Sequence, residues 1–145
     1  MHPLLRLAIQ AVEHFIKTGE PLPCPNPLPD DLKQNAGAFV TIKNQGSLRG
    51  CIGTISRKYK NLAEEVIINA IRSANEDPRF DPIEKRELAS LIFSVDLLTP
   101  PEKINDLEDH NVKQFGLIVL GRGKQGVLLS DLDNIKSANQ IFIAF

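Results

Sequence analysis

The sequence predicts an α+β fold in which a mixed or antiparallel sheet is flanked by helices. Three observations lead to this prediction. Two segments repeat apolar residues at helical spacing, other segments alternate apolar and polar residues as strands do, and turns join some of these strands into hairpins. The chain has 145 residues, which suits one domain or a domain with a small lobe, and we interpret residues 1–145 as a single domain.

Residues 3–17 and 61–75 are the predicted helices. In the first, apolar side chains recur every three or four residues, and Gly19 follows the expected end. In the second, Asn61 is a candidate N-cap, and Glu64 three residues later predicts a variant capping box. Each segment has a broad apolar face, which is typical of a helix that covers a sheet.

Strands are predicted before and after the second helix. Residues 38–43 alternate in polarity, and residues 48–55 return after the turn at 44–47 as the second arm of a hairpin. Residues 88–98 are apolar on both alternating faces, which predicts a central strand that is covered on both sides. Prolines alternate with other residues in 20–30, and this pattern predicts a stiff connector.

A second hairpin is predicted from residues 115–120 and 127–129. Between them, residues 121–126 match the GxGxxG pattern of dinucleotide-binding loops. Such a loop must open a helix after its first strand, whereas here another strand follows. We therefore interpret this stretch as a hairpin tip and not as a phosphate-binding loop. Residues 134–145 are expected to begin a final helix.

Composition narrows the classes of function. The formal net charge of −1 gives no concentrated basic surface for nucleic-acid binding, and the short basic run at 57–60 is typical of a solvated loop. No apolar run approaches the ~20 residues of a membrane span, and the start lacks a signal-peptide pattern. Cys24 and Cys51 form no disulfide or metal-binding pattern. We expect a cytoplasmic protein and predict neither a metal nor a cofactor.

The run Arg49-Gly50-Cys51-Ile52-Gly53-Thr54 is the candidate functional segment, because its glycines allow close backbone approach at an unusual cost for a strand. In one interpretation Cys51 is a nucleophile. Arg49, two residues away on the same strand face, and Arg79 from a later loop favour its thiolate. Gly50 and Gly53 leave backbone donors open to a substrate oxygen. The sequence places no histidine base beside the cysteine.

A structural interpretation competes with this one. Cys51 is then a small buried apolar residue, and Arg49 pairs with an acid such as Asp77. Gly50 and Gly53 mark a bulge or tight packing. The residues alone favour this second interpretation over catalysis.

Five separated segments together resemble the AMMECR domain family, whose bacterial members are called AmmeMemoRadiSam system protein A. The resemblance covers nearly the whole chain, and the joined Leu-Arg-Gly-Cys-Ile-Gly and Asp-Pro-Arg-Phe motifs are its most specific part. It implies a compact α+β fold with a larger and a smaller lobe, and it implies Memo-type and radical SAM proteins as partners. No settled activity comes with it. The segments are Gly37–Thr41, Leu48–Thr54, Leu62–Glu65, Asp77–Phe80 and Gly116–Leu129.

The chain departs from the family pattern near its end. Leu129-Ser130 stands where relatives often carry Leu-Pro, and the Lys-Ala-Gly ending of relatives beyond Phe145 is absent. Phe115 occupies a position where some relatives have a histidine, which weakens the argument for a Cys–His pair.

Two hypotheses for function result. In the first, the protein is a module that binds a small ligand or a protein. In the second, it is a thiol-dependent enzyme that uses Cys51 on a small molecule. The predicted binding residues are Arg49, Gly50, Ile52, Gly53, Thr54, Asp77, Arg79 and Phe80.

Overall fold

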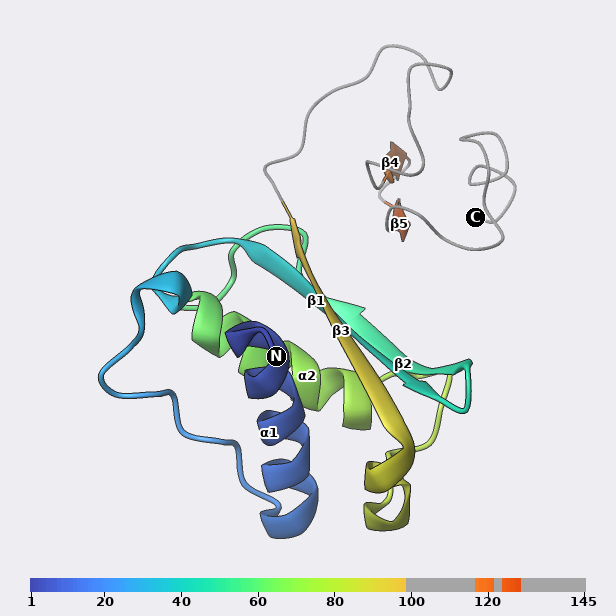
Figure 1. Cartoon of the computed structure of the whole chain (residues 1–145). Helices are drawn as coiled ribbons and strands as arrows, with labels where there is room; N and C mark the ends of the chain where they lie inside the picture. Colours follow the sequence, from blue (N-terminus) through green and yellow to red (C-terminus); the bar gives the residue numbers. More distant parts are fainter. Residues whose placement is uncertain (99–116, 122–123, 129–145) are drawn as a thin grey trace. The chain divides into compact units, whose positions relative to one another are not determined.

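The computed structural model describes residues 1–98, 117–121 and 124–128. Contacts divide the chain into two compact units, Met1–Pro100 and Pro101–Phe145. The α+β fold that the sequence predicts is confirmed (Figure 1). The first unit contains, in chain order, α1 (Pro3–Thr18), the 3-10 helix η1 (Asp30–Leu32), β1 (Gly37–Asn44), β2 (Ser47–Gly53), α2 (Leu62–Asn75), the 3-10 helix η2 (Lys85–Ser90) and β3 (Leu91–Leu98).

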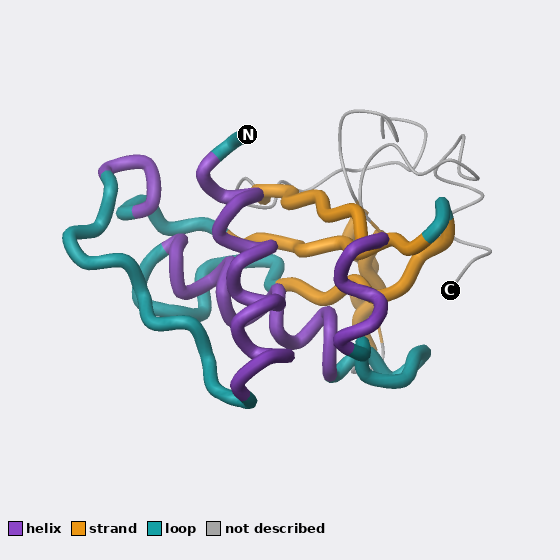
Figure 2. Tube along the Cα trace, turned by 60° about the horizontal axis from the view of Figure 1, so that its bottom comes forward, coloured by secondary structure: helices purple, strands orange, loops and turns teal. Residues whose placement is uncertain are grey.

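The three strands of the first unit form an antiparallel sheet in the order β2-β1-β3, so β1 lies in the centre. Both long helices lie on one side of this sheet (Figure 1, Figure 2). Ala38, Val40 and Ile42 of β1 face the helices and are fully buried, whereas Phe39 and Thr41 between them face the other side and are half-buried. The core therefore lies between the sheet and the helix layer.

The helix ends follow the sequence signals, with one difference. Gly19 ends α1 with a left-handed φ of 77°, and the Asn61 side chain caps α2 by accepting from the Glu64 N–H at 2.9 Å. The Glu64 carboxylate instead accepts from the Lys60 N–H at 3.3 Å. The predicted capping box is therefore wrong, because its second bond goes to a residue one position earlier.

The β1–β2 hairpin contains a tight turn and a bulge. Gln45 and Gly46 form a two-residue turn in which φ is 52° and 81°, a geometry that matches the twist of paired strands. Leu48 and Gly50 both pair with β1, but Arg49 between them has no partner residue. This bulge interrupts the alternation of side chains between the two faces of β2. The prediction that Arg49 and Cys51 share a strand face therefore does not follow from their spacing of two residues.

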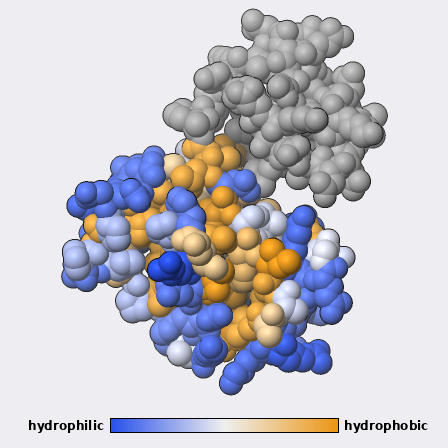
Figure 3. Space-filling view, viewed as in Figure 1, coloured by the Kyte–Doolittle hydropathy of each residue, from blue (hydrophilic) through white to orange (hydrophobic). Residues whose placement is uncertain are grey.

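The prediction of a central strand at residues 88–98 is wrong in two respects. The first three of these residues belong to η2, and β3 lies at the edge of the described sheet. Only one face of β3 packs on the core, whereas Ile92 on the other face is 65% exposed. Apolar residues are also visible at the surface along the course of β3 (Figure 3). The residues packed against the core are Leu91, Phe93 and Val95.

The second unit contains a hairpin of β4 (Leu117–Gly121) and β5 (Lys124–Leu128). The hairpin that the sequence predicts is confirmed, but its strands pair up to Gly121 and Lys124. The expected six-residue tip is therefore wrong, since four residues of the GxGxxG match lie in strands. The helix predicted to begin in residues 134–145 lies outside the described residues.

Candidate functional site

Three buried polar side chains of helix α2 form a stripe along the edge strand β2. Glu65, Asn69 and Ser73 recur every four residues, so they lie on one face of the helix, and none is more than 1% exposed. The Ser73 hydroxyl accepts from the Ile52 N–H at 2.8 Å and lies 2.7 Å from the Val40 carbonyl oxygen, to which it can donate. The stripe satisfies main-chain groups of β2 that no further strand of the described sheet pairs.

Thr54 ties the end of β2 to this stripe. Its hydroxyl donates to the Glu65 carboxylate at 2.8 Å and accepts from the Asn69 amide at 3.1 Å. The other oxygen of Glu65 accepts from the N–H groups of Lys58 and Tyr59 at 2.7 Å and 3.1 Å. The buried carboxylate is thus fully hydrogen-bonded, and the loop that leads into α2 is fixed by it.

The two glycines of the candidate segment are explained by close packing. A Cβ on Gly50 would lie 2.0 Å from the Ser73 carbonyl oxygen, so α2 can approach the sheet only if this residue is glycine. A Cβ on Gly53 would lie 2.4 Å from both the Ala38 carbonyl oxygen and the Phe39 ring. These contacts favour the packing interpretation of both glycines over an oxyanion site.

Arg49 fastens β2 to the segment that follows α2. Its Nε and Nη2 atoms donate to the two carboxylate oxygens of Glu87 at 2.8 Å and 3.0 Å, and its Nη1 donates to the Asp81 carbonyl at 2.7 Å. The two side chains are 18% and 20% exposed, and the pKa of Glu87 is lowered chiefly by its hydrogen bond to Arg49. Arg49 therefore pairs with Glu87, and the predicted alternative partner Asp77 binds elsewhere.

Asp77 connects the loop after α2 to the middle of β2. It is 4% exposed and accepts from the Cys51 N–H at 3.0 Å and from the Arg79 N–H at 3.1 Å. The Arg79 guanidinium donates to both of its oxygens, at 3.0 Å and 2.7 Å. This hydrogen-bonded guanidinium is the largest cause that lowers the pKa of Asp77 to about 2. The carboxylate is thus ionised and fully engaged.

Arg79 is the exposed member of this pair. Its side chain is 55% exposed, its guanidinium lies 5.5 Å from the centre of the Phe80 ring, and Nη2 is 3.5 Å from the Cys51 carbonyl oxygen. Two of its three nitrogens are held by Asp77, so its direction is fixed although it reaches solvent. The structure therefore places Arg79 beside Cys51, as the sequence interpretation expected.

Cys51 pairs with Thr41 of the central strand and shares its sheet face, which points away from the helices. The Cys51 sulfur is 3.2 Å from the Thr41 hydroxyl, and the residue is half-buried. Burial raises the pKa of Cys51 above the ordinary thiol value, and the Thr41 hydrogen bond and the Arg79 charge oppose this only in part. The neutral thiol is therefore the main form at pH 7.

The structure thus separates the predicted residues into two sets. Cys51, Arg79 and Phe80 lie together at the surface, on the support that Asp77 gives them. Arg49, Gly50, Gly53 and Thr54 make internal contacts, and Ile52 is half-buried beside Val40. The sequence interpretation missed four supporting residues. Three of them share a signal, which is polar side chains recurring every four residues along α2, whereas the fourth has none; they are Glu65, Asn69, Ser73 and Glu87.

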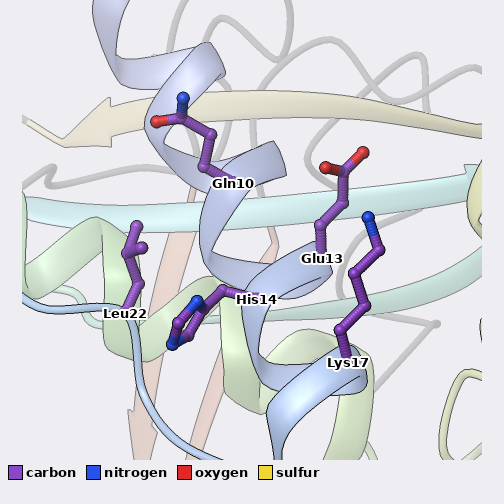
Figure 4. A pocket seen from close by; sticks show the side chains of 5 residues that line it. All are labelled: Gln10, Glu13, His14, Lys17 and Leu22. Atoms are coloured by element: carbon purple, nitrogen blue, oxygen red, sulfur yellow. The ribbon is translucent and has the colours of Figure 1, made fainter.

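A separate depression of ≈ 360 Å³ lies against α1 (Figure 4). It is lined by Gln10, Glu13, His14, Lys17 and Leu22, and it contains none of the predicted site residues. His14 and Leu22 lie on one side of it, and Glu13 and Lys17 lie on the other.

Within residues 1–98 and the β4–β5 hairpin, histidine, cysteine and acidic side chains form no group of three that could hold a metal ion. The helices of this described part include none whose length and apolar character would let it cross a membrane.

Comparisons with known proteins agree with the motifs. The family model AMMECR1 matches residues 5–144. A protein of Thermotoga maritima is 39% identical over 141 residues, which cover 96% of this chain and 81% of the relative. A protein of Clostridium acetobutylicum is 39% identical over 145 residues, which cover 95% of this chain but only 30% of the relative.

The fold has a counterpart among solved structures. The crystal structure of an uncharacterised protein from Pyrococcus horikoshii matches with a TM-score of 0.80 and 38% identity, over 87% of this chain and 66% of that one. The chain thus spans from under a third to about four fifths of the relatives it matches. By its family model, its relatives and its fold, the chain belongs to the AMMECR1 family.

Proposed function

We propose that this AMMECR1-family protein is a binding module whose functional surface is formed by β2 around Cys51 and by the loop Asp77–Phe80. The observation that carries this proposal is the exposed Arg79 guanidinium, which buried Asp77 holds beside the Cys51 backbone. An arginine whose direction is already fixed loses less conformational freedom when a ligand binds it. It can therefore bind a ligand at a lower entropic cost than a freely moving surface arginine.

The residues of the candidate site have two different roles in this proposal. Arg79, Phe80 and the Cys51 side chain are exposed enough to touch a ligand. Arginine and aromatic side chains supply a large share of the affinity in many protein interfaces. The remaining residues hold the surface in shape through their internal bonds; they are Arg49, Gly50, Ile52, Gly53, Thr54 and Asp77.

The alternative function is a thiol-dependent enzyme in which Cys51 attacks a small molecule. Burial raises the pKa of Cys51, so the nucleophilic thiolate is the minor form near pH 7. In the described part of the chain, the Cys51 sulfur has a hydroxyl of Thr41 as its hydrogen-bond partner, and a hydroxyl is a poor general base. Both observations support binding over nucleophilic catalysis.

The family resemblance supplies the partners of this proposal. A Memo-type protein and a radical SAM protein of the same organism, acting with this chain in the cytoplasm, are the proposed binding partners. Nucleic acid is not proposed as a partner, because a formal net charge of −1 gives no basis for counterion-driven binding.

The proposal is tested by measuring the affinity of the purified chain for each purified partner by biolayer interferometry. Arg79→Ala should weaken binding by about tenfold or more, as expected for an arginine at the centre of an interface. Arg86→Ala is the matched control, because Arg86 is 83% exposed and pairs only with nearby Glu84 in the described residues. Affinities that are equal for the wild type and Arg79→Ala, or the absence of binding to both proteins, would overturn the proposal.

A further inference from the structure

One edge of the Arg79 guanidinium is open for recognition. Its Nε and Nη2 atoms donate to Asp77, whereas Nη1 has no acceptor among the described residues. The planar guanidinium group binds carboxylate and phosphate oxygens with well-defined geometry. Because Asp77 fixes the inner edge of the group, the position of the outer edge is fixed as well.

The surface next to this edge is made of small hydrogen-bonding side chains. The strand registers place Cys51 of β2, Thr41 of β1 and Ser94 of β3 opposite one another, on the face that points away from the helices. None of the three is fully buried, and together they form one polar row across the sheet. Arg79 reaches this row at its β2 end, where Nη2 lies 3.5 Å from the Cys51 carbonyl.

Three charged groups act on the Cys51 thiol, namely Arg79, Asp77 and Asp96. Asp77 is buried and its carboxylate already accepts from four N–H groups, so the pair presents its positive end to solvent. Asp96 lies on β3, opposite Phe39 and two strands from β2, at roughly 10 Å for two strand spacings. Of the two exposed charges, Arg79 has the larger effect on the thiol, and Arg79 is positive.

We propose that the outer edge of Arg79 is an anion-binding position, and that the ligand of this surface carries a carboxylate or phosphate group that lies next to the Cys51 thiol. This inference rests on the proposed binding function and names the chemical class of the ligand. The anion contacts Nη1, and the adjoining part of the ligand lies over the row that begins at Cys51.

Two alkylating reagents of equal size but different charge test this position on the intact chain. Iodoacetate is an anion and iodoacetamide is neutral, and both transfer a carbon to the thiolate sulfur with release of iodide. The ratio of their rates at one cysteine cancels the thiol pKa and exposure, and it reports the local charge. Cys24 provides the internal comparison when the two cysteine peptides are quantified by mass spectrometry.

At low ionic strength, the iodoacetate-to-iodoacetamide ratio should be roughly threefold or more higher at Cys51 than at Cys24. Arg79→Gln should abolish this excess, Arg79→Lys should retain part of it, and Arg86→Gln should leave it unchanged. Inorganic phosphate should slow iodoacetate at Cys51 more than chloride of equal ionic strength does. Equal ratios at the two cysteines of the wild type would overturn the inference.

Arg79→Gln leaves a buried carboxylate without its partner, so Asp77→Asn/Arg79→Gln provides a second measurement that removes both charges. An excess that persists in either variant with native circular dichroism overturns the anion position. If Arg79→Ala weakens partner binding while the iodoacetate-to-iodoacetamide ratio at Cys51 does not change in the Arg79 variants, the binding function is supported and the anion inference is wrong. If the ratio depends on Arg79 while partners bind Arg79→Ala normally, the proposed function falls instead.

Discussion

Replacing Asp77 with asparagine measures how strongly one buried carboxylate holds the Arg79 loop against β2. The pKa of Asp77 falls from 3.8 to about 2 in the folded protein, chiefly through the Arg79 guanidinium. A lowering of this size corresponds to about 2.5 kcal/mol of folding free energy at neutral pH. Asparagine keeps the shape but turns one acceptor into a donor that faces other donors. Asp77→Asn should therefore lower the free energy of unfolding at pH 7 by about 2.5 kcal/mol.

The pH dependence gives this prediction its sign. Because the folded-state pKa is the lower one, the contribution of Asp77 is fully present above about pH 4 and is lost as pH falls from 3.8 towards 2. Urea unfolding followed by far-ultraviolet circular dichroism, from pH 7 to 2.5, measures it. Asp81→Asn is the control, since the Asp81 side chain is exposed and only its carbonyl is bonded. A loss below about 0.5 kcal/mol at pH 7, or one that stays undiminished at pH 2.5, would refute the reasoning.

Two further predictions concern the contacts that shape the surface. Gly50→Ala should destabilise the protein by roughly 3 kcal/mol in urea unfolding, because its Cβ would meet the Ser73 carbonyl oxygen at 2.0 Å and displace α2. An unchanged midpoint would show that α2 can shift at little cost. A double-mutant cycle with Arg49→Gln and Glu87→Gln should give a coupling energy of about 2 kcal/mol, because the pair is bidentate and mostly buried. If the losses of unfolding free energy in the two single variants were additive, Arg49 would act through its main-chain carbonyl contacts and not through Glu87.

Local signals were sufficient for the helices and the first hairpin. The helix boundaries follow from apolar periodicity together with Gly19 and Asn61, and the turn at Gln45-Gly46 lies where the strand patterns reverse. The position of β3 could not be predicted in this way. Its two faces are both rich in apolar residues, and only the pairing with β1 decides that Ile92 faces solvent.

The candidate site was predictable only where its partners are close in sequence or carry a motif. Asp77 and Arg79 are two residues apart, and their proximity to Cys51 could be expected from the joined motifs. The partner of Arg49 could not, because Glu87 is 38 residues away and several acids lie between them. The bulge at Arg49 was also invisible, since one extra residue in a strand leaves no compositional mark.

The glycine-rich run Arg49–Thr54 therefore meets three structural requirements in six consecutive residues. Close approach of α2 requires Gly50, sheet packing requires Gly53, and the buried acid Glu65 requires a hydroxyl at Thr54. A segment with these requirements would have nearly the same sequence whether or not a ligand ever touched it. The outer edge of the Arg79 guanidinium has no such structural requirement. Variants of Arg79, and not variants of the run itself, therefore distinguish a binding surface from a packing motif.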